Sequence, residues 1–231
     1  MSSDFVHLHV HSDYSVLDGA CKIHELLDRC EKFGMTACAL TDHGNLFGAI
    51  EFYQRAKSRG VKPIIGSELY VAPKDRVDKS SKFLGSFNNH FLLLCENETG
   101  YHNLCRLSSL GYLEGFYYKP RVDDGLLAKY SEGLIATTSC LAGRVPQAIL
   151  NDDLDLANAQ IKQYIEMFGK DNFLVELMCH GLPEQDKVNP ILAEMAEHDV
   201  ARRFSLGRLH VGRACSLSAN TKKRFLGYRG R

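Results

Sequence analysis

The chain has 231 residues, of which 45% are hydrophobic and 24% charged, as in an ordinary soluble protein long enough to bury a real core. No apolar run approaches the roughly 20 residues of a membrane span, and the N-terminus lacks the basic-then-apolar pattern of a secretory signal. We therefore expect a cytoplasmic protein rather than a membrane-spanning or secreted one. Eight cysteines are scattered without CxxC pairs, so we expect reduced thiols.

The net charge of zero hides an uneven distribution. Residues 201–231 hold nine Lys/Arg and no Asp/Glu, whereas all 28 acidic residues lie within the first 200. This break predicts two regions: a folded domain over residues 1–200 and an aberrant, disordered basic tail over 201–231.

Strand and helix patterns alternate along the first 200 residues. The alternation of polar and apolar side chains over residues 5–12 is typical of a strand. Asn45 and Thr99 are the expected N-caps of two helices, and Gly34 and Gly60 suit helix ends. Strands are expected over 5–12, 35–45, 61–73, 90–97, 133–143 and 173–181. Helices are expected over 22–34, 45–60, 99–113, 126–130, 144–151, 153–169 and 184–199.

This alternation predicts a parallel sheet, open or closed into a barrel. Both kinds of fold build their functional sites at the carboxyl ends of the strands. Several expected strands end in residues that bind metals or transfer protons, so we expect one shared site. These residues are His9, His11, Asp42, His43, Glu68, Cys140 and His180.

Two of these residues make a metal site the leading hypothesis. His9 and His11, two positions apart on one strand face, can bind one metal ion, and a nearby carboxylate completes a set that Zn²⁺ or Mn²⁺ accepts. Glu68 lies in an apolar run, where an unpaired carboxylate carries a heavy desolvation cost, so a cation partner is expected. Cys140 adds a soft thiolate ligand.

Simpler explanations remain open for other members of the set. Asp18 precedes Gly19 and could be a turn residue only. Asp42 and His43 could cap the next helix. His90 and Cys140 could be core residues.

Other catalytic classes lack their signatures. The Gly-x-Ser-x-Gly pattern of a nucleophile elbow is absent, and Cys140 as a nucleophile lacks a local signature. No Walker loop occurs, and no GxGxxG follows a strand, so cradling of a nucleotide by glycine amides is not supported.

Five ordered motifs cover about residues 5–200 and carry a family resemblance. The chain resembles the N-terminal PHP (polymerase and histidinol phosphatase) domain of bacterial DNA polymerase III alpha subunits in FVHLHVHSDYSVLDGA, ALTDHGNLFGAIEFY, GVKPIIGSELYVAP, NNHFLLLCENETGYHNL and GLIATTSCLAG. The resemblance implies a distorted seven-stranded β/α barrel with up to three ions, Zn²⁺ or Mn²⁺, at the carboxyl ends of the strands.

The resemblance also implies the roles of particular residues. His7 stands where many family members have aspartate, so His7 and Asp42 are expected to support the ligands rather than bind metal. The implied ligands are His9, His11, Asp18, His43, Glu68, His90 and Cys140.

The implied activity is phosphoester hydrolysis at the 3′ end of a DNA strand, within a DNA-directed DNA polymerase that acts with other replicase subunits. Polymerization by this chain alone is not expected, because the polymerase palm is missing. Two alternatives remain open. One is a structural and interaction module with a non-functional metal site, and the other is a small-molecule phosphatase of the histidinol phosphatase type.

The last part of the family pattern is missing. The family continues with an apolar strand ending in Asn-Asp-x-His, which supplies two further ligands, but no Asp or Glu follows Asp199 here. We therefore expect an incomplete barrel whose last strand is replaced by the basic tail. The favoured interpretation is a segment that did not evolve as part of the domain, produced by a shifted reading frame, a gene break or a truncation. The alternative is a basic arm that binds nucleic acid.

Overall fold

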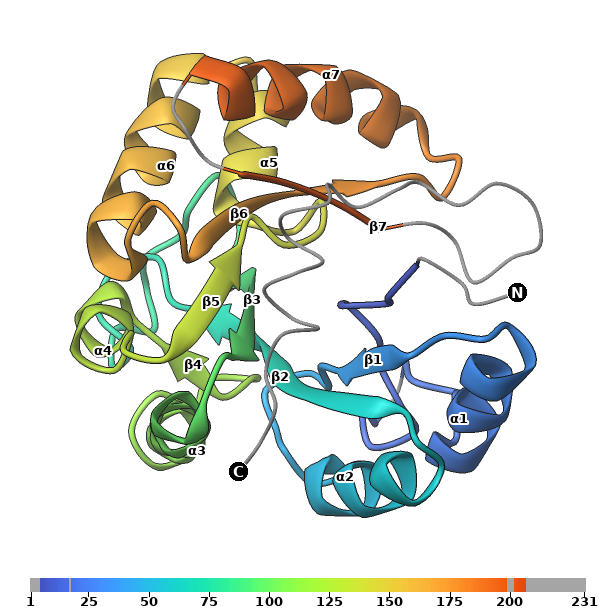
Figure 1. Cartoon of the computed structure of the whole chain (residues 1–231). Coiled ribbons are helices and arrows are strands. Elements are labelled where there is room, and N and C mark those ends of the chain that lie inside the picture. The colour runs from blue at the N-terminus through green and yellow to red at the C-terminus, as the bar shows by residue number, and fades with distance from the viewer. Residues whose placement is uncertain (1–4, 17, 199–201, 207–231) are drawn as a thin grey trace.

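The computed structural model describes residues 5–16, 18–198 and 202–206. These residues form a mixed α/β structure whose curled sheet is covered by helices on its outer side (Figure 1). The strands are β1 (Ala37–Leu40), β2 (Lys62–Val71), β3 (Asn89–Cys95), β4 (Arg121–Val122), β5 (Leu134–Thr137), β6 (Phe173–Met178) and β7 (Arg202–Leu206). The helices are α1 (Ile23–Lys32), α2 (Ala49–Ser58), α3 (Glu98–Leu113), α4 (Asp124–Lys129), α5 (Arg144–Leu150), α6 (Leu154–Phe168) and α7 (Pro183–His198).

The sheet is mixed, so the prediction of a wholly parallel sheet was wrong. Its strand order is β1-β2-β3-β5-β6-β7, with the short β4 beside β2. The strand β3 runs antiparallel to both β2 and β5, and the other pairs are parallel. Because β3 is reversed, its first residues lie at the sheet edge where its neighbours end, and His90 therefore reaches the same edge as residues that follow other strands.

The sheet is a curled half-barrel, and a complete seven-stranded barrel is not formed by the described residues. The strands β1 and β7 end the strand order, and no ladder joins them within the part of the chain described. The N-terminal segment contacts β1 through an isolated bridge between His7 and Cys38.

Residues 5–12 do not form the expected strand. The backbone N–H of Val10 donates to Thr41 Oγ1 at 2.8 Å, and that of Ser12 donates to Asp42 Oδ1 at 2.6 Å. The side chains of Thr41 and Asp42 thus accept hydrogen bonds from backbone N–H groups that a strand ladder would have paired with carbonyls. The segment therefore stays extended without regular pairing.

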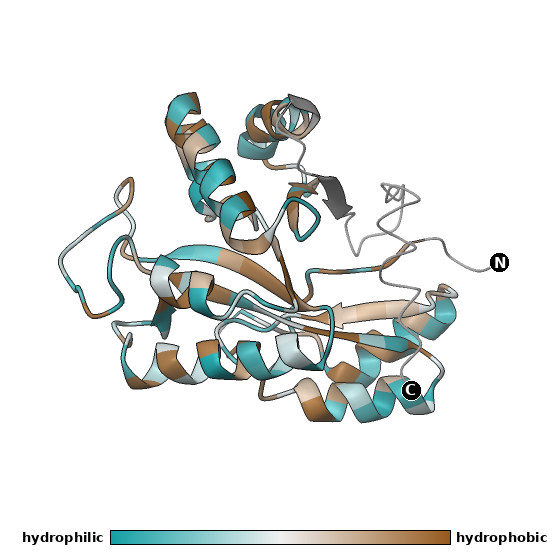
Figure 2. Ribbon diagram, turned by 60° about the vertical axis from the view of Figure 1, so that its left-hand side comes forward, coloured by the Kyte–Doolittle hydropathy of each residue, from teal (hydrophilic) through white to brown (hydrophobic). Residues whose placement is uncertain are grey.

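The core has an outer and an inner part. Cys38 and Leu40 of β1 pack with α1 and α2, whereas Ala37 and Ala39 pack with apolar residues from β2, β3, β5 and β6 on the other face of the sheet. This alternation of faces follows from the period of two in a strand. A larger cluster joins β2, β3, β5 and β6 to the helices α3 to α7. In Figure 2 the strands are mostly hydrophobic, whereas the helices mix hydrophobic and hydrophilic residues.

Two expected N-caps were misplaced by a few residues. The N-cap of α2 is Gly48 rather than Asn45, whose side chain instead accepts a hydrogen bond from the backbone of Phe47 at 3.0 Å. The N-cap of α3 is Asn97 rather than Thr99, and its Oδ1 accepts from the backbone of Gly100 at 3.0 Å. The expected helix ends are confirmed, since Gly34 and Gly60 have φ of 63° and 71°.

The basic segment after α7 begins with a strand. Residues Arg202–Leu206 form β7, which pairs in parallel with β6. The expectation that this segment supplies no strand was therefore wrong, because backbone pairing does not require the Asn-Asp-x-His motif. Residues 207–231, where a disordered tail was expected, lie outside the described residues.

Two broader expectations, on the cysteines and on membrane spans, can be compared with the structure. All seven cysteines in the described ranges are free thiols. No helix within those ranges is both long and apolar enough to cross a membrane.

Candidate metal centre

The centre is built around Glu68, a carboxylate on β2 that is only 1% exposed. Its Oε2 lies 3.3 Å from His9 Nε2, 3.1 Å from His11 Nε2 and 3.1 Å from His43 Nδ1. Its Oε1 lies 3.1 Å from His90 Nδ1. One carboxylate therefore contacts four imidazoles, which come from the N-terminal segment, the end of β1 and the reversed start of β3.

The two remaining expected ligands extend this cluster. Asp18 Oδ2 lies 2.7 Å from His43 Nε2, and its side chain is 56% exposed. Cys140 Sγ lies 3.4 Å from His90 Nδ1, and Cys140 follows β5. The structure thus brings all seven residues of the expected ligand set into one contiguous cluster.

The segment between His11 and Gly19 is shaped by Asp42. The carboxylate of Asp42 accepts hydrogen bonds from the Ser12 hydroxyl at 2.9 and 3.0 Å and from the Ser15 hydroxyl at 2.9 Å. Gly19 packs so tightly that a Cβ there would lie 1.7 Å from the carbonyl oxygen of Ser12. Asp42 therefore holds the loop that carries Asp18, which agrees with a supporting role.

His7, the other residue expected to support the ligands, lies apart from the cluster. Its ring packs edge-on against Phe5 at a centroid distance of 4.6 Å. Burial lowers the pKa of His7 to about 4, so the ring is neutral at pH 7. Its place in the structure is that of a buried histidine packed among apolar residues.

The electrostatics of the centre follow from burial and mutual contact. Burial opposes the charged form of His9, but Glu68 and Glu176 outweigh it and raise the pKa of His9 well above its usual range. Burial likewise opposes ionization of Glu68, but the surrounding imidazoles hold the pKa of Glu68 well below normal. Burial lowers the pKa of His43 to about 4 and, together with Glu68, raises that of Cys140.

The residues present fit a metal site. Two triads place their ligand atoms within 4.8 Å of one another: His9, His11 and Glu68, and His43, Glu68 and His90. The buried Nδ1 of His43 lies 3.1 Å from Glu68 Oε2 but makes no well-aligned hydrogen bond among the described residues, although buried polar atoms normally make one. Imidazole, carboxylate and thiolate donors together suit Zn²⁺ or Mn²⁺.

A second buried carboxylate, missed in the sequence, supports the centre. Glu176 on β6 accepts a hydrogen bond from His9 Nδ1 at 2.7 Å and another from the Thr137 hydroxyl at 2.5 Å. Its backbone N–H donates to Thr138 Oγ1 at 2.9 Å. The signal was present, because Glu176 lies in the apolar run FLVELM just as Glu68 lies in PIIGSELYV.

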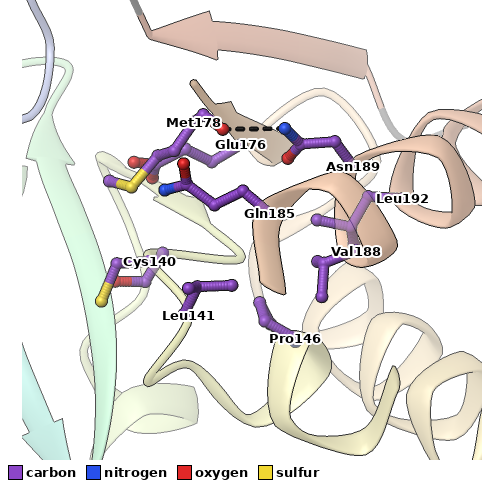
Figure 3. Close-up of a pocket in the computed structure, with 10 residues that line it drawn as sticks. Cys140, Leu141, Pro146, Glu176, Met178, Gln185, Val188, Asn189 and Leu192 are labelled. Carbon is purple, nitrogen blue, oxygen red and sulfur yellow. Dashed lines mark hydrogen bonds between the residues drawn. The ribbon is translucent and has the colours of Figure 1, made fainter. Parts of the chain in front are cut away.

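His180, also considered from the sequence, does not join the cluster. It is exposed after β6, and its backbone N–H donates to Gln185 Oε1 at 2.7 Å. Gln185, on α7, lines a small cavity together with Cys140 and Glu176 (Figure 3). The cavity volume is about 10 Å³, roughly the space one water molecule needs.

The curled sheet and the histidine–carboxylate centre match a known domain class. A family profile described as "PHP domain" matches residues 7–180, and the chain belongs to this family. It is 50% identical over 192 residues to the DNA polymerase III subunit alpha of Treponema pallidum. The matched region covers 83% of this chain and 16% of that protein. It is also 50% identical over 206 residues to that of Thermus aquaticus, covering 88% and 16%. The chain therefore spans about a sixth of the length of these relatives.

Two solved structures share the fold. One, from Bifidobacterium adolescentis, is provisionally described as a metal-dependent phosphoesterase, with a TM-score of 0.53 and 14% identity over 87% of this chain and 85% of that one. The other is an amidohydrolase from Chromobacterium violaceum, with a TM-score of 0.55 and 14% identity over the same shares.

Proposed function

We propose that this chain is a metal-dependent phosphoesterase domain of a replicative DNA polymerase alpha subunit, acting on the 3′ end of a DNA strand. The observation that carries the proposal is the convergence of four imidazoles on the buried Glu68, with Asp18 and Cys140 at the edges of the cluster. The names of the relatives support DNA as the substrate. Such a domain would act in the cytoplasm beside other replicase subunits.

Each group of residues has a proposed role in this centre. When bound, divalent cations supply positive charge that polarizes a phosphoryl group and lowers the pKa of water. The carboxylate of Glu176 accepts a hydrogen bond from His9 Nδ1. This bond fixes the ring of His9 and directs its Nε2 towards the centre. Ser139 donates to Glu68 Oε1 at 2.7 Å and fixes that carboxylate. The proposed ligands for Zn²⁺ or Mn²⁺, up to three ions, are His9, His11, Asp18, His43, Glu68, His90 and Cys140.

One observation favours the alternative of a structural module. The family's final Asp-x-His pair has no counterpart, because no Asp or Glu follows Asp199. A centre with too few ligands would retain little metal, and the domain would then serve only to stabilize or dock other parts of a polymerase. Metal content separates this alternative from the proposal.

The proposal is tested on the purified 231-residue chain. After incubation with Zn²⁺ or Mn²⁺ and gel filtration, we expect at least one bound ion per chain by mass spectrometry. With those ions, the chain should shorten a 5′-labelled single-stranded oligodeoxynucleotide from its 3′ end. His43→Ala should lose both properties, whereas His102→Ala, whose side chain is 63% exposed on α3, should keep them.

Three outcomes would count against the proposal. Protein with less than one ion in ten chains supports the structural module instead. Hydrolysis of a small phosphomonoester without shortening of DNA supports a phosphatase of the histidinol phosphatase type. Shortening that survives in His43→Ala points to a contaminating nuclease.

A further inference from the structure

Three exposed aromatic rings lie in a row on the outer surface. Phe47, Tyr112 and Phe116 are 66%, 40% and 52% exposed. The ring centroids of Phe47 and Tyr112 are 6.4 Å apart with planes inclined by 38°, and those of Tyr112 and Phe116 are 6.2 Å apart with planes inclined by 27°. We call these three residues the aromatic row. Such a gathering of exposed rings is typical of an interaction surface.

The aromatic row begins next to the metal centre. Phe47 follows the proposed ligand His43 by four residues. The carbonyl of Gly44, between them, accepts a hydrogen bond from the Ser108 hydroxyl on α3 at 3.1 Å. Tyr112 lies one helical turn beyond Ser108 on the same helix. This hydrogen bond links the loop that runs from His43 to Phe47 with the helix that carries Tyr112.

A lysine contacts an aromatic ring that packs on two of the imidazoles. Lys119 Nζ is 5.2 Å from the ring centroid of Tyr70. The ring of Tyr70 stacks on His43 at 5.6 Å and meets His90 at 5.2 Å. Lys119 thus places a positive charge beside the centre, only three residues along the chain from Phe116.

We infer that the aromatic row is a platform on which unpaired bases of a single-stranded nucleic acid stack, while Lys119 contacts its phosphates. The inference rests on the proposed function for its scissile phosphate and adds the residues that hold the neighbouring nucleotides. Two features favour this occupant over an apolar protein surface. The three rings are 40% to 66% exposed. A cation complementary to phosphate, Lys119, lies against Tyr70, whose ring stacks on His43, and follows Phe116 by three residues.

Binding is measured without hydrolysis, so that this test does not depend on the proposed chemistry. The probe is a fluorescein-labelled oligothymidine, titrated with the 231-residue chain in EDTA and followed by fluorescence anisotropy. Stacking contributes about 1–3 kcal/mol per base, so Phe47→Ala, Tyr112→Ala or Phe116→Ala should each weaken binding at least about fivefold. The matched control is Phe33→Ala, a ring of similar exposure (42%) in the turn that precedes β1, at the opposite end of that strand from His43.

Two further variants distinguish stacking from general hydrophobicity. Tyr112→Phe keeps the ring face and should bind as the unsubstituted chain does. Tyr112→Leu keeps apolar area without a ring and should bind as weakly as Tyr112→Ala. Circular dichroism melts confirm that each variant is folded. Lys119→Ala should reduce the salt dependence of binding by about one unit of slope in log Kd against log salt.

An abasic oligonucleotide of the same length completes the test, because it offers phosphates and no bases. The unsubstituted chain and Tyr112→Ala should bind it equally. The inference is overturned if the chain does not bind oligothymidine, if Tyr112→Leu binds as well as Tyr112→Phe, or if the alanine variants bind as tightly as Phe33→Ala. Hydrolysis without any effect of the aromatic row would leave the proposed function intact and remove the platform.

Discussion

The surroundings of Glu68 and Glu176 differ, although both carboxylates are 1% exposed and both contact His9. Glu68 is surrounded by imidazoles whose nitrogens are metal donors. Glu176 is held by the hydroxyl of Thr137 and contacts one imidazole through Nδ1, the nitrogen that faces away from Glu68. A carboxylate that contacts several potential metal-binding nitrogens lies where a metal ligand would lie. A carboxylate held by a hydroxyl and one imidazole lies where it would orient a ligand.

The difference matters because burying a carboxylate is costly unless it is paired. Glu68 is paired with several groups that would also bind metal, so its environment changes when ions enter. Under the proposed function, Glu68 would bind metal and Glu176 would orient His9, and the following variants test that division.

The largest effect is expected from Glu68→Ala. The variant should lose detectable bound metal, because both candidate triads contain Glu68. In the metal-free protein, removing one partner from a buried charged group should lower the free energy of unfolding by about 3–5 kcal/mol. Mass spectrometry of the metal content and urea unfolding measure the two effects. One ion per chain in Glu68→Ala would remove Glu68 from the ligand set.

Glu176→Ala should have a smaller effect on the same property. Loss of a carboxylate that orients a metal-binding histidine typically weakens metal affinity about 10- to 100-fold. Competition with a chromophoric chelator gives the affinity, and Thr137→Val, which leaves Glu176 one donor short, should shift it in the same direction by less. Unchanged affinity in Glu176→Ala would erase the distinction between an orienting carboxylate and a merely buried one.

His7 offers a contrast, since it is a buried histidine packed against Phe5 rather than either carboxylate. Its pKa is lowered from 6.5 to about 4. A group with a depressed pKa contributes stability above its unfolded pKa, and this contribution is lost as pH falls towards the folded value. Between pH 7 and pH 5.5, the loss should be about 1 kcal/mol.

Urea unfolding at the two pH values, in EDTA, measures the His7 effect. Because other histidines also titrate, the relevant quantity is the difference between the unsubstituted chain and His7→Leu. The variant should lose about 1 kcal/mol less stability over this interval. An equal loss in both proteins would mean that His7 is not held neutral by its surroundings.

The smallest effect is expected from Glu51→Gln on α2. Glu51 is half-exposed and lies outside the cluster of imidazoles, so this variant shows what the loss of an ordinary carboxylate costs in stability. Glu51 pairs with Arg55 at 2.8 Å and accepts from the Tyr14 hydroxyl at 2.9 Å. Exposed ion pairs contribute little to stability, so the melting temperature should fall by at most about 2 °C, with unchanged metal content. A larger fall would show that exposure is a poor guide to the cost of losing a carboxylate here.

Much of the fold and of the site could be predicted from the sequence. The spacing of apolar residues predicted the helices and most strands, and the ordered motifs named Glu68 and the six other expected ligands that now cluster with it. The direction of β3 could not be predicted, because an apolar run has the same pattern in either direction. The loss of regular pairing over residues 5–12 depends on Thr41 and Asp42, whose bonds to that segment exist only after folding.

Glu176 was missed for a different reason. The desolvation argument made for Glu68 applies equally to a glutamate within FLVELM. However, FLVELM lies in none of the five family motifs, so Glu176 was not among the expected ligands. The N-caps were misplaced because local backbone geometry decides where a helix begins. Asn45 closes a turn onto the backbone of Phe47 before α2 starts, and Asn97 rather than Thr99 caps α3.

The close packing of Gly19 against the carbonyl of Ser12 has a consequence for interpreting related sequences. Any other residue at this position would push the turn outward and carry Asp18 away from His43. A homologue could retain every donor atom and still have a disabled centre, if only this small residue had changed. Surveys that score the histidines, carboxylates and thiol should therefore include the glycine as a marker of competence.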